Sequence, residues 1–247
     1  MKYTYLYLFI LILPCMVTLS GCQVARIASL SQKVSYTQMP FEQHKPNAHL
    51  NILFLGDSTA VGTGARPEDS VAGWFAKDFP EADIKNISQN GEKIKDLIDK
   101  IPDNSKHYNL VVLQIGANDI MRLTRLKKVK QNLAVAIDRA KLIGDQMIML
   151  HSGDVGLAPI FIWPLNSIYS ARSKAFRKIY MQMAQTKGVM YVDLLRDSKH
   201  DLFLTDINKY YSPDLLHPSG AGYHFWYDEL QKTLKANESV HPIFMNT

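Results

Sequence analysis

The regular alternation of short apolar runs with apolar stripes of helical spacing constrains the fold of this chain most strongly. The runs of strand length stand at residues 50–55, 84–88, 110–115, 147–150 and 189–192. The stripes of helical spacing stand at 71–79, 94–101, 126–140, 176–183 and 223–234. Strands that alternate with helices form a parallel sheet with helices on both faces. The sequence therefore predicts an α/β fold, a three-layer α/β/α sandwich around a five-stranded parallel sheet.

Composition agrees with one globular domain. The chain has 247 residues, of which 47% are hydrophobic and 21% are charged, so disorder of the whole chain is excluded. The net charge of +5 is a mild excess. Its densest basic cluster lies on the predicted helix at 126–140 or just before it, where a solvated helix face is expected rather than a nucleic-acid site. The cluster comprises Arg122, Arg125, Lys127, Lys128 and Lys130.

The N-terminus has the features of an export signal. Lys2 precedes an apolar stretch at 3–17, and the segment ends in Leu19-Ser20-Gly21-Cys22. This pattern is typical of a secretory leader, and its last four residues resemble the bacterial lipobox. The resemblance implies cleavage before Cys22, lipidation of Cys22 with palmitate-like acyl chains, and anchoring to a membrane. The alternative, an uncleaved signal anchor, also places the domain outside the cytoplasm.

These signals divide the chain into three parts. We expect a lipoprotein signal peptide at 1–21, a polar tether at 22–49 and one domain at 50–247. The protein would then lie in the cell envelope on the periplasmic face, and Gln23 after the cysteine favours the outer membrane. The only other cysteine is Cys15. A lipidated Cys22 would leave the mature domain without a thiol nucleophile, a disulfide or a cysteine zinc site.

Four polar strings follow predicted strands or precede the last helix. In parallel α/β sheets, ligands bind beyond the carboxyl ends of the strands, so the fold should bring these strings to one edge. The strings are Gly56-Asp57-Ser58-Thr59, Asn90-Gly91, Gly116-Ala117-Asn118-Asp119 and Asp214-Leu215-Leu216-His217-Pro218. In this order they resemble the conserved blocks of the SGNH (GDSL-type) hydrolase family, from about residue 51 to 223.

The resemblance implies a flavodoxin-like sheet and hydrolysis of esters, thioesters or O-acetyl groups. It places the family's catalytic residues on Ser58, Gly91, Asn118 and His217. The family's acid stands three residues before the histidine, and Asp214 occupies that place. No Gly-x-Ser-x-Gly elbow is present in the sequence, which disfavours the α/β-hydrolase fold.

The chemistry of these residue types supports the same roles. A serine hydroxyl needs a base within hydrogen-bond reach, and a neutral imidazole held by a carboxylate meets that need. The backbone N–H groups of Ser58 and Gly91 and the amide of Asn118 are candidate oxyanion donors, each with a value of about 3 kcal/mol. We expect no metal and no cofactor, because the other histidines show no ligand-like spacing with carboxylates.

Several residues have plainer interpretations. Asp57 and Asp119 are expected to brace the loops beside Ser58 and Asn118, and Thr63 and Gly64 to shape the first loop. His151 ends a strand near the active edge and is a candidate pocket residue. Two questions stay open. One is whether an acid after the fifth strand, at 193, 197, 201 or 206, replaces Asp214. The other is whether the apolar segment 161–163 packs inside or faces an acyl chain or bilayer.

The sequence therefore predicts a serine esterase with an acyl-enzyme intermediate, acting on short acyl or lipid-like esters. The alternatives are an O-acetylesterase of carbohydrate or peptidoglycan and, outside enzymes, a binding lipoprotein that uses the fold without catalysis. The expected partners are a small-molecule or glycan ester and, through the lipid anchor, a membrane. No nucleic-acid partner is expected.

Overall fold

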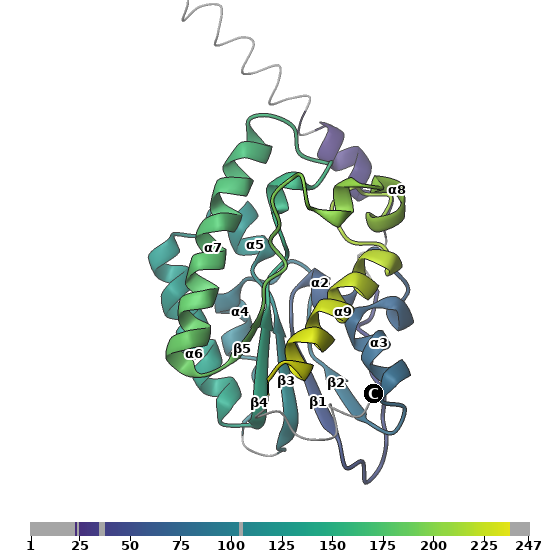
Figure 1. The fold of residues 1–247 in the computed structure, drawn as a ribbon, viewed down its shortest axis with the longest axis vertical. Helices are drawn as coiled ribbons and strands as arrows, with labels where there is room; N and C mark the ends of the chain where they lie inside the picture. The colour runs from purple at the N-terminus through teal and green to yellow at the C-terminus, as the bar shows by residue number, and fades with distance from the viewer. Residues whose placement is uncertain (1–22, 24, 35–37, 104–105, 238–247) are drawn as a thin grey trace, which may run out of the picture.

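A parallel sheet of five strands forms the centre of the molecule (Figure 1). The computed structural model describes residues 23, 25–34, 38–103 and 106–237. The strand order is β2-β1-β3-β4-β5, and all pairs are parallel. This is the flavodoxin-like order, as expected from the sequence. The strands are β1 (Asn51–Gly56), β2 (Asp83–Asn86), β3 (Tyr108–Gln114), β4 (Gly144–Leu150) and β5 (Met190–Val192).

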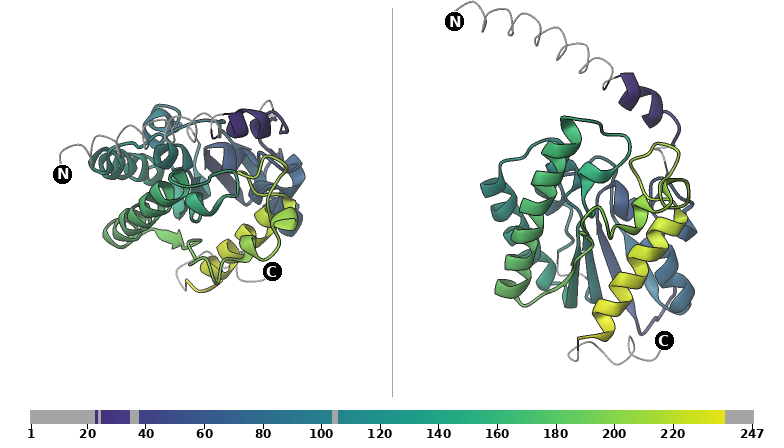
Figure 2. Two further views of the ribbon diagram at one scale, coloured as in Figure 1. Left: turned by 90° about the horizontal axis from the view of Figure 1, so that it is seen from above. Right: turned by 45° about the horizontal axis from the view of Figure 1, so that its top comes forward.

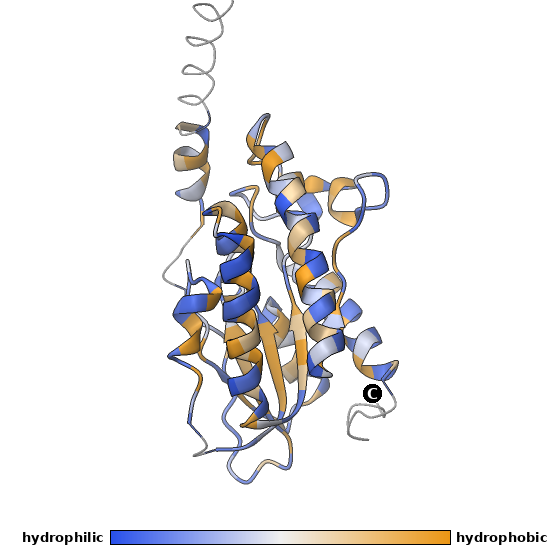
Figure 3. Ribbon diagram, turned by 90° about the vertical axis from the view of Figure 1, so that its left-hand side faces the viewer, coloured by the Kyte–Doolittle hydropathy of each residue, from blue (hydrophilic) through white to orange (hydrophobic). Residues whose placement is uncertain are grey.

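The strands read as unbroken apolar runs because both faces of the sheet are covered. In Figure 3 the strands are orange, whereas the helices around them carry both orange and blue. Along β1, Leu53 belongs to one core cluster and Phe54 to the other, and both side chains are fully buried. Alternate residues of a strand thus serve opposite faces.

Helices cover the two faces of the sheet unequally (Figure 2). One core cluster joins the sheet to α4 (Ile94–Ile98), α5 (Ala117–Met121), α6 (Leu126–Lys141) and α7 (Leu165–Lys187). The other core cluster joins the sheet to α3 (Val71–Asp78) and α9 (Gly220–Lys235). The short elements are α2 (Ser58–Val61), α8 (Ile207–Tyr210), η1 (Pro67–Asp69), η2 (Val155–Leu157) and η3 (Leu202–Leu204). The predicted three layers are confirmed.

The helix expected at 176–183 is much longer than its apolar stripe. It begins at Leu165 and ends at Lys187, with Gly188 in the left-handed conformation as its C-terminal cap. Its first turns carry few buried apolar side chains, so no apolar stripe marks them in the sequence. The five basic residues at 122–130 are all exposed, which confirms a solvated surface.

The segment expected as a tether contacts the domain at several places. Residues 25–31 are helical, and Leu30 is buried against the α4–α7 side of the core. Further along, Gln43 and Ile84 exchange two backbone hydrogen bonds, of 3.0 and 2.8 Å. Because β2 is an edge strand, its open side has unpaired backbone groups that Gln43 satisfies. The segment is therefore attached more closely than a simple tether.

No helix among the described residues has the length and apolar character needed to cross a membrane. The expected signal peptide and the lipidation site at Cys22 lie outside the described residues.

Candidate active site

Ser58 lies at the carboxyl end of β1, as the first residue of α2. Asp57 caps this helix: its Oδ1 accepts hydrogen bonds from the backbone N–H (2.9 Å) and the hydroxyl (2.8 Å) of Thr59. Its Oδ2 accepts from Gly116 N–H at 3.1 Å, beyond the end of β3. Asp57 therefore braces two neighbouring loops, as predicted, and fixes the position of Ser58.

The imidazole of His217 meets the Ser58 hydroxyl, although 159 residues separate them. His217 Nε2 lies 2.9 Å from Ser58 Oγ, and Nδ1 lies 2.6 Å from Asp214 Oδ2. All three residues are buried. With Nδ1 donating to the carboxylate, Nε2 is left to accept the serine proton. The structure thus brings together the predicted nucleophile, base and acid.

Asp214 is held as a carboxylate by the turn that contains it. Its Oδ1 accepts from the hydroxyl of Ser212 (2.6 Å) and from the N–H groups of Leu216 and His217 (both 2.9 Å). Burial raises the pKa of Asp214, but the hydrogen bond and charge of His217, with these donors, outweigh it and hold the pKa at about 2. Asp214 therefore stays ionised at working pH. Ser212 is a site residue that the sequence analysis missed.

Gly64 lets the loop after α2 approach the turn of His217. Its φ is +99°, and a Cβ built there would lie 2.7 Å from the carbonyl oxygen of Pro218 and 2.9 Å from His217 Cβ. Both the backbone conformation and the lack of space require glycine. Its neighbour Thr63 donates to Asn90 Oδ1 at 2.6 Å. Both residues thus shape the first loop, as predicted.

Asn118 presents an unused donor at the same edge of the sheet. It is buried at the start of α5, and its Nδ2 has no hydrogen-bond partner among the described residues. Such a group incurs a desolvation cost unless a ligand accepts from it. Gly91, with φ +80°, follows β2 on the other side of β1, and a Cβ built there would lie 3.5 Å from Nη2 of Arg122. Ser58 N–H, at the first position of α2, has no partner within that helix.

These donors lie at the switch point of the sheet. Here β2 lies on one side of β1 and the later strands lie on the other side. The neighbours β1 and β3 pair from Ile52↔Leu110 to Gly56↔Gln114, and the connections from them run to opposite sides. Ligands bind at such a switch point in open α/β sheets. Asp119 braces this region, because its Oδ2 accepts from Ile94 N–H at 2.8 Å.

A pocket with a cavity volume of about 70 Å³ extends from Ser58 and His217. Its walls come from the loops after β4 and β5 and from α9. The apolar lining includes Val155, Leu194, Phe203, Phe225 and Trp226. The polar lining includes Asp154, Arg196 and Asp201. No pattern in the sequence indicated these walls.

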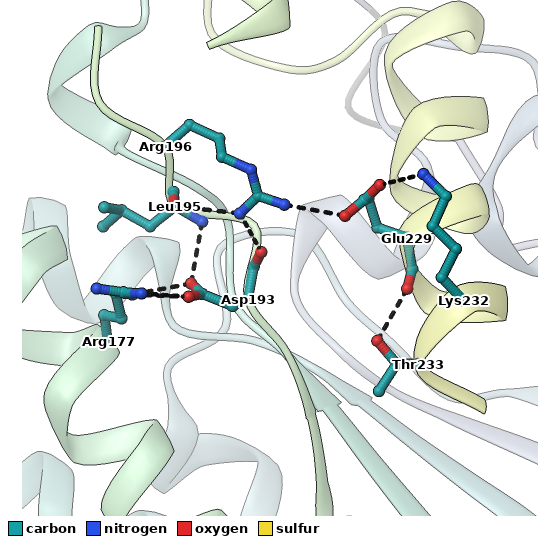
Figure 4. A network of polar contacts seen from close by, with 7 residues as sticks. All are labelled: Arg177, Asp193, Leu195, Arg196, Glu229, Lys232 and Thr233. Carbon is teal, nitrogen blue, oxygen red and sulfur yellow. Dashed lines mark hydrogen bonds and ion pairs between the residues drawn. The ribbon is translucent and has the colours of Figure 1, made fainter. Parts of the chain in front are cut away.

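A polar network fixes the loop that forms one wall of this pocket (Figure 4). Arg177 of α7 pairs with Asp193 just after β5, with Nε at 2.8 Å from Oδ2. Arg196 donates to the Asp193 carbonyl at 2.5 Å and to Glu229 Oε2 of α9 at 2.9 Å. The loop is thereby linked to helices on both faces of the sheet. Asp193 is engaged there, so it does not replace Asp214 as partner of His217.

His151 lies behind the pocket and does not line it. Its side chain is fully buried, with ring centroids 5.2 Å from Tyr180 and 5.8 Å from Tyr191. The expectation of a pocket residue is therefore wrong, because the chain turns after β4 and presents Ser152 and Gly153 instead. The described residues contain no cluster of three potential metal ligands.

Comparison with known proteins adds independent support for the fold. The structure resembles a lipolytic protein of the G-D-S-L family from Veillonella parvula (TM-score 0.60, 15% identity, 76% of this chain and 100% of that one). It also resembles TesA (TM-score 0.59, 20% identity, 75% and 98%). A third likeness is to an acetylxylan esterase from Geobacillus stearothermophilus (TM-score 0.55, 18% identity, 76% and 95%). No curated protein matches the chain in sequence.

A family model supplies the assignment that these distant likenesses do not. The model of the GDSL-like lipase/acylhydrolase family matches residues 54–225. This span begins within β1, covers Ser58 and Asn118, and extends beyond His217. The serine, the imidazole and the carboxylate are linked by hydrogen bonds at the switch point of the sheet. The chain is therefore an ester hydrolase and belongs to the GDSL-like lipase/acylhydrolase family.

Proposed function

We propose that Ser58 is the nucleophile, His217 its base and Asp214 the residue that orients the imidazole. The observation that carries this is the continuous contact from Asp214 Oδ2 through the imidazole to Ser58 Oγ. Ser58 Oγ attacks the ester carbonyl carbon while its proton passes to His217 Nε2. The imidazolium then protonates the leaving alkoxide oxygen as the C–O bond breaks. Water, deprotonated by the same imidazole, releases the acid from the acyl-enzyme.

Oxyanion stabilisation is assigned to the N–H groups of Ser58 and Gly91 and to the Asn118 amide. The unpartnered Nδ2 of Asn118 supports this role. Neutral donors aimed at the developing charge need no reorganisation during the reaction.

The lining of the pocket favours an acyl group longer than acetyl. The aromatic and aliphatic walls next to Ser58 suit a hydrocarbon chain. The substrate class proposed is therefore an ester of a medium-length acyl group, including lipid-like esters.

The polar part of the lining favours a second candidate, an O-acetylesterase of glycans. Asp154, Arg196 and Asp201 offer hydrogen-bonding groups that a sugar uses. A non-catalytic binding role would leave the contact between Ser58 and His217 without purpose.

A hydrolysis panel distinguishes these candidates. We expect p-nitrophenyl butyrate and octanoate to be cleaved with higher kcat/KM than the acetate, and Ser58→Ala to abolish all three activities. Val155→Phe should shift the preference toward acetate by filling the pocket, whereas the matched Val155→Ala should not. Release of acetate from acetylated glycan without cleavage of longer esters would favour the second candidate. Unchanged rates in Ser58→Ala would contradict the assignment of the nucleophile.

We propose further that the protein is anchored in the bacterial cell envelope through lipidated Cys22. The apolar stretch at 3–17 and the lipobox-like Leu19-Ser20-Gly21-Cys22 support this. Metabolic labelling with an alkyne analogue of palmitate should mark the protein in its host. Cys22→Ala should lose the label, and Cys15→Ala should keep it. A label that persists in Cys22→Ala would contradict the proposed site.

A further inference from the structure

Three large apolar side chains lie exposed within seven residues of each other. Ile162, Trp163 and Ile168 are 39%, 61% and 41% exposed, and we call them the Ile162–Ile168 patch. They occupy the loop before α7 and the first turn of α7. Their neighbour Phe161 is buried, with its ring centroid 4.8 Å from that of Tyr169. Single exposed apolar residues are ordinary, but a contiguous group indicates an interaction surface.

The patch lies beside the mouth of the pocket. Ala158, just before this loop, lines the pocket. Two residues on, Ile160 N–H donates to the carbonyl of Leu215 at 3.1 Å. Leu215 lies between Asp214 and His217 in the turn that holds the base. A surface that docks on the patch would therefore lie next to the entrance through which substrate reaches Ser58.

The first described residue of the chain is bound to the same loop. Gln23 Nε2 donates to the carbonyl of Ile162 at 2.8 Å, and the Gln23 side chain is buried. One helical turn later, Arg26 donates to the carbonyls of Pro159 (2.9 Å) and Ile160 (3.2 Å). In Figure 1 the purple N-terminal helix lies beside the loop that precedes α7.

The position of Gln23 determines where a membrane would be. Cys22 directly precedes Gln23, and the apolar stretch at 3–17 ends five residues before Cys22. A lipidated Cys22 and an uncleaved signal anchor would both bring the bilayer to this point of the surface. The patch is thus continuous with the attachment site under either form of attachment.

We propose that the Ile162–Ile168 patch inserts into the interface of the phospholipid bilayer that holds the protein, so that the pocket mouth faces the membrane surface. The inference rests on the membrane attachment proposed above and does not depend on the esterase chemistry. Tryptophan suits this depth, since its ring is apolar and its N–H remains near the headgroups. The attachment supplies proximity, and the patch fixes which face of the domain is turned toward the lipid. Esters in the membrane leaflet that faces the domain would then be presented directly to Ser58.

Tryptophan quenching by brominated lipids tests this orientation. The full chain, purified from host membranes, is reconstituted into phosphatidylcholine vesicles with or without brominated acyl chains. The three tryptophans are Trp74, Trp163 and Trp226. We expect brominated lipid to quench the wild-type emission, Trp163→Phe to lose most of this quenching, and the matched Trp74→Phe to retain it. The substitution lies on an exposed side chain, so the fold should tolerate it.

Each other outcome contradicts the proposal in a distinct way. Vesicles that float with the protein but do not quench Trp163 would overturn the orientation and leave the attachment intact. A full chain that does not float with the vesicles would overturn both. Shielding of Trp163 from aqueous iodide without quenching by brominated lipid would assign the patch to a contact with a second copy of the chain instead. The same measurements on Ser58→Ala separate the orientation from catalysis, because quenching needs no turnover.

Discussion

At the scale of single residues, the site depends on a few polar atoms whose partners are fixed or absent. Asp214 Oδ1 accepts three hydrogen bonds, whereas Asn118 Nδ2 has no partner among the described residues. The first arrangement holds a charge permanently, and the second keeps a donor ready for a charge that forms only during the reaction. Two predictions follow from this contrast.

Asn118→Ala should lower kcat by about 10²- to 10³-fold while KM changes little, because the lost donor acts on the transition state. Asn118→Asp should be at least as impaired, since a carboxylate repels the oxyanion. Steady-state kinetics on p-nitrophenyl butyrate measure both effects. Circular dichroism provides the control for folding. A kcat of Asn118→Ala within about threefold of wild type would exclude the amide from the oxyanion site.

Asp214→Asn should lower kcat by about 10³- to 10⁴-fold, since the amide no longer fixes the tautomer of His217 or stabilises the imidazolium. The wild-type carboxyl, with a pKa of about 2, stays ionised at every pH at which the enzyme is assayed. The pH profile of kcat/KM should therefore contain no ionisation of this group. A variant as active as wild type would show that another group orients the imidazole.

At the scale of elements, the loops at the carboxyl edge are held to each other by side chains. Asp57 joins the loops after β1 and β3, and the Arg177–Asp193 and Arg196–Glu229 pairs join the loop after β5 to α7 and α9. The surface pairs contribute little to stability each. The buried acceptor Asp57 contributes more, because its donors have no water to replace it.

Asp57→Asn should destabilise the protein by about 2 kcal/mol, because an amide oxygen serves fewer of the three donors and its NH₂ group opposes one of them. The melting temperature should fall by about 4–8 °C for a domain of this size. Ser58 should also be displaced, with a lower kcat. Differential scanning calorimetry measures the change, and exposed Asp138→Asn serves as the matched control. Equal melting temperatures for the two variants would refute the bracing role.

Elements with a periodic apolar pattern were predictable from the sequence, and those without one were not. β3 at 108–114 and α6 at 126–141 lie close to their expected bounds because their apolar residues face the core. The first turns of α7 and the short α2, α5 and α8 carry no such stripe. The triad was predictable from the resemblance of four strings to a family. The pocket walls were not, because Val155, Leu194 and Phe225 meet only through packing of three separate loops and helices.

At the scale of the whole molecule, the sheet core contains a group whose protonation opposes folding. His151 is fully buried between Tyr180 and Tyr191, and burial lowers its pKa from 6.5 to about 4. Between these two pH values the unfolded chain binds a proton that the folded chain does not. Stability therefore rises with pH across this window and falls as pH drops from about 6.5 toward 4.

His151→Phe should remove most of this acid sensitivity, which amounts to about 3 kcal/mol if the shift is fully expressed. The free energy of unfolding in urea, measured at about pH 5 and pH 7.5, gives the pH dependence of each variant. The exposed His49→Phe should keep the wild-type dependence of the free energy of unfolding on pH. If the free energy of unfolding depends on pH equally in the His151 and His49 variants, the buried imidazole is not the source of the acid sensitivity.

The turn from Ser212 to His217 carries both the base and its carboxylate, only three residues apart. A displacement of that turn therefore moves the imidazole and Asp214 as one body and leaves their mutual contact of 2.6 Å intact. Such a motion does change the 2.9 Å distance between His217 Nε2 and Ser58 Oγ, because Ser58 lies on α2 in a different part of the chain. Assembly of the triad therefore depends on how this turn is placed against α2.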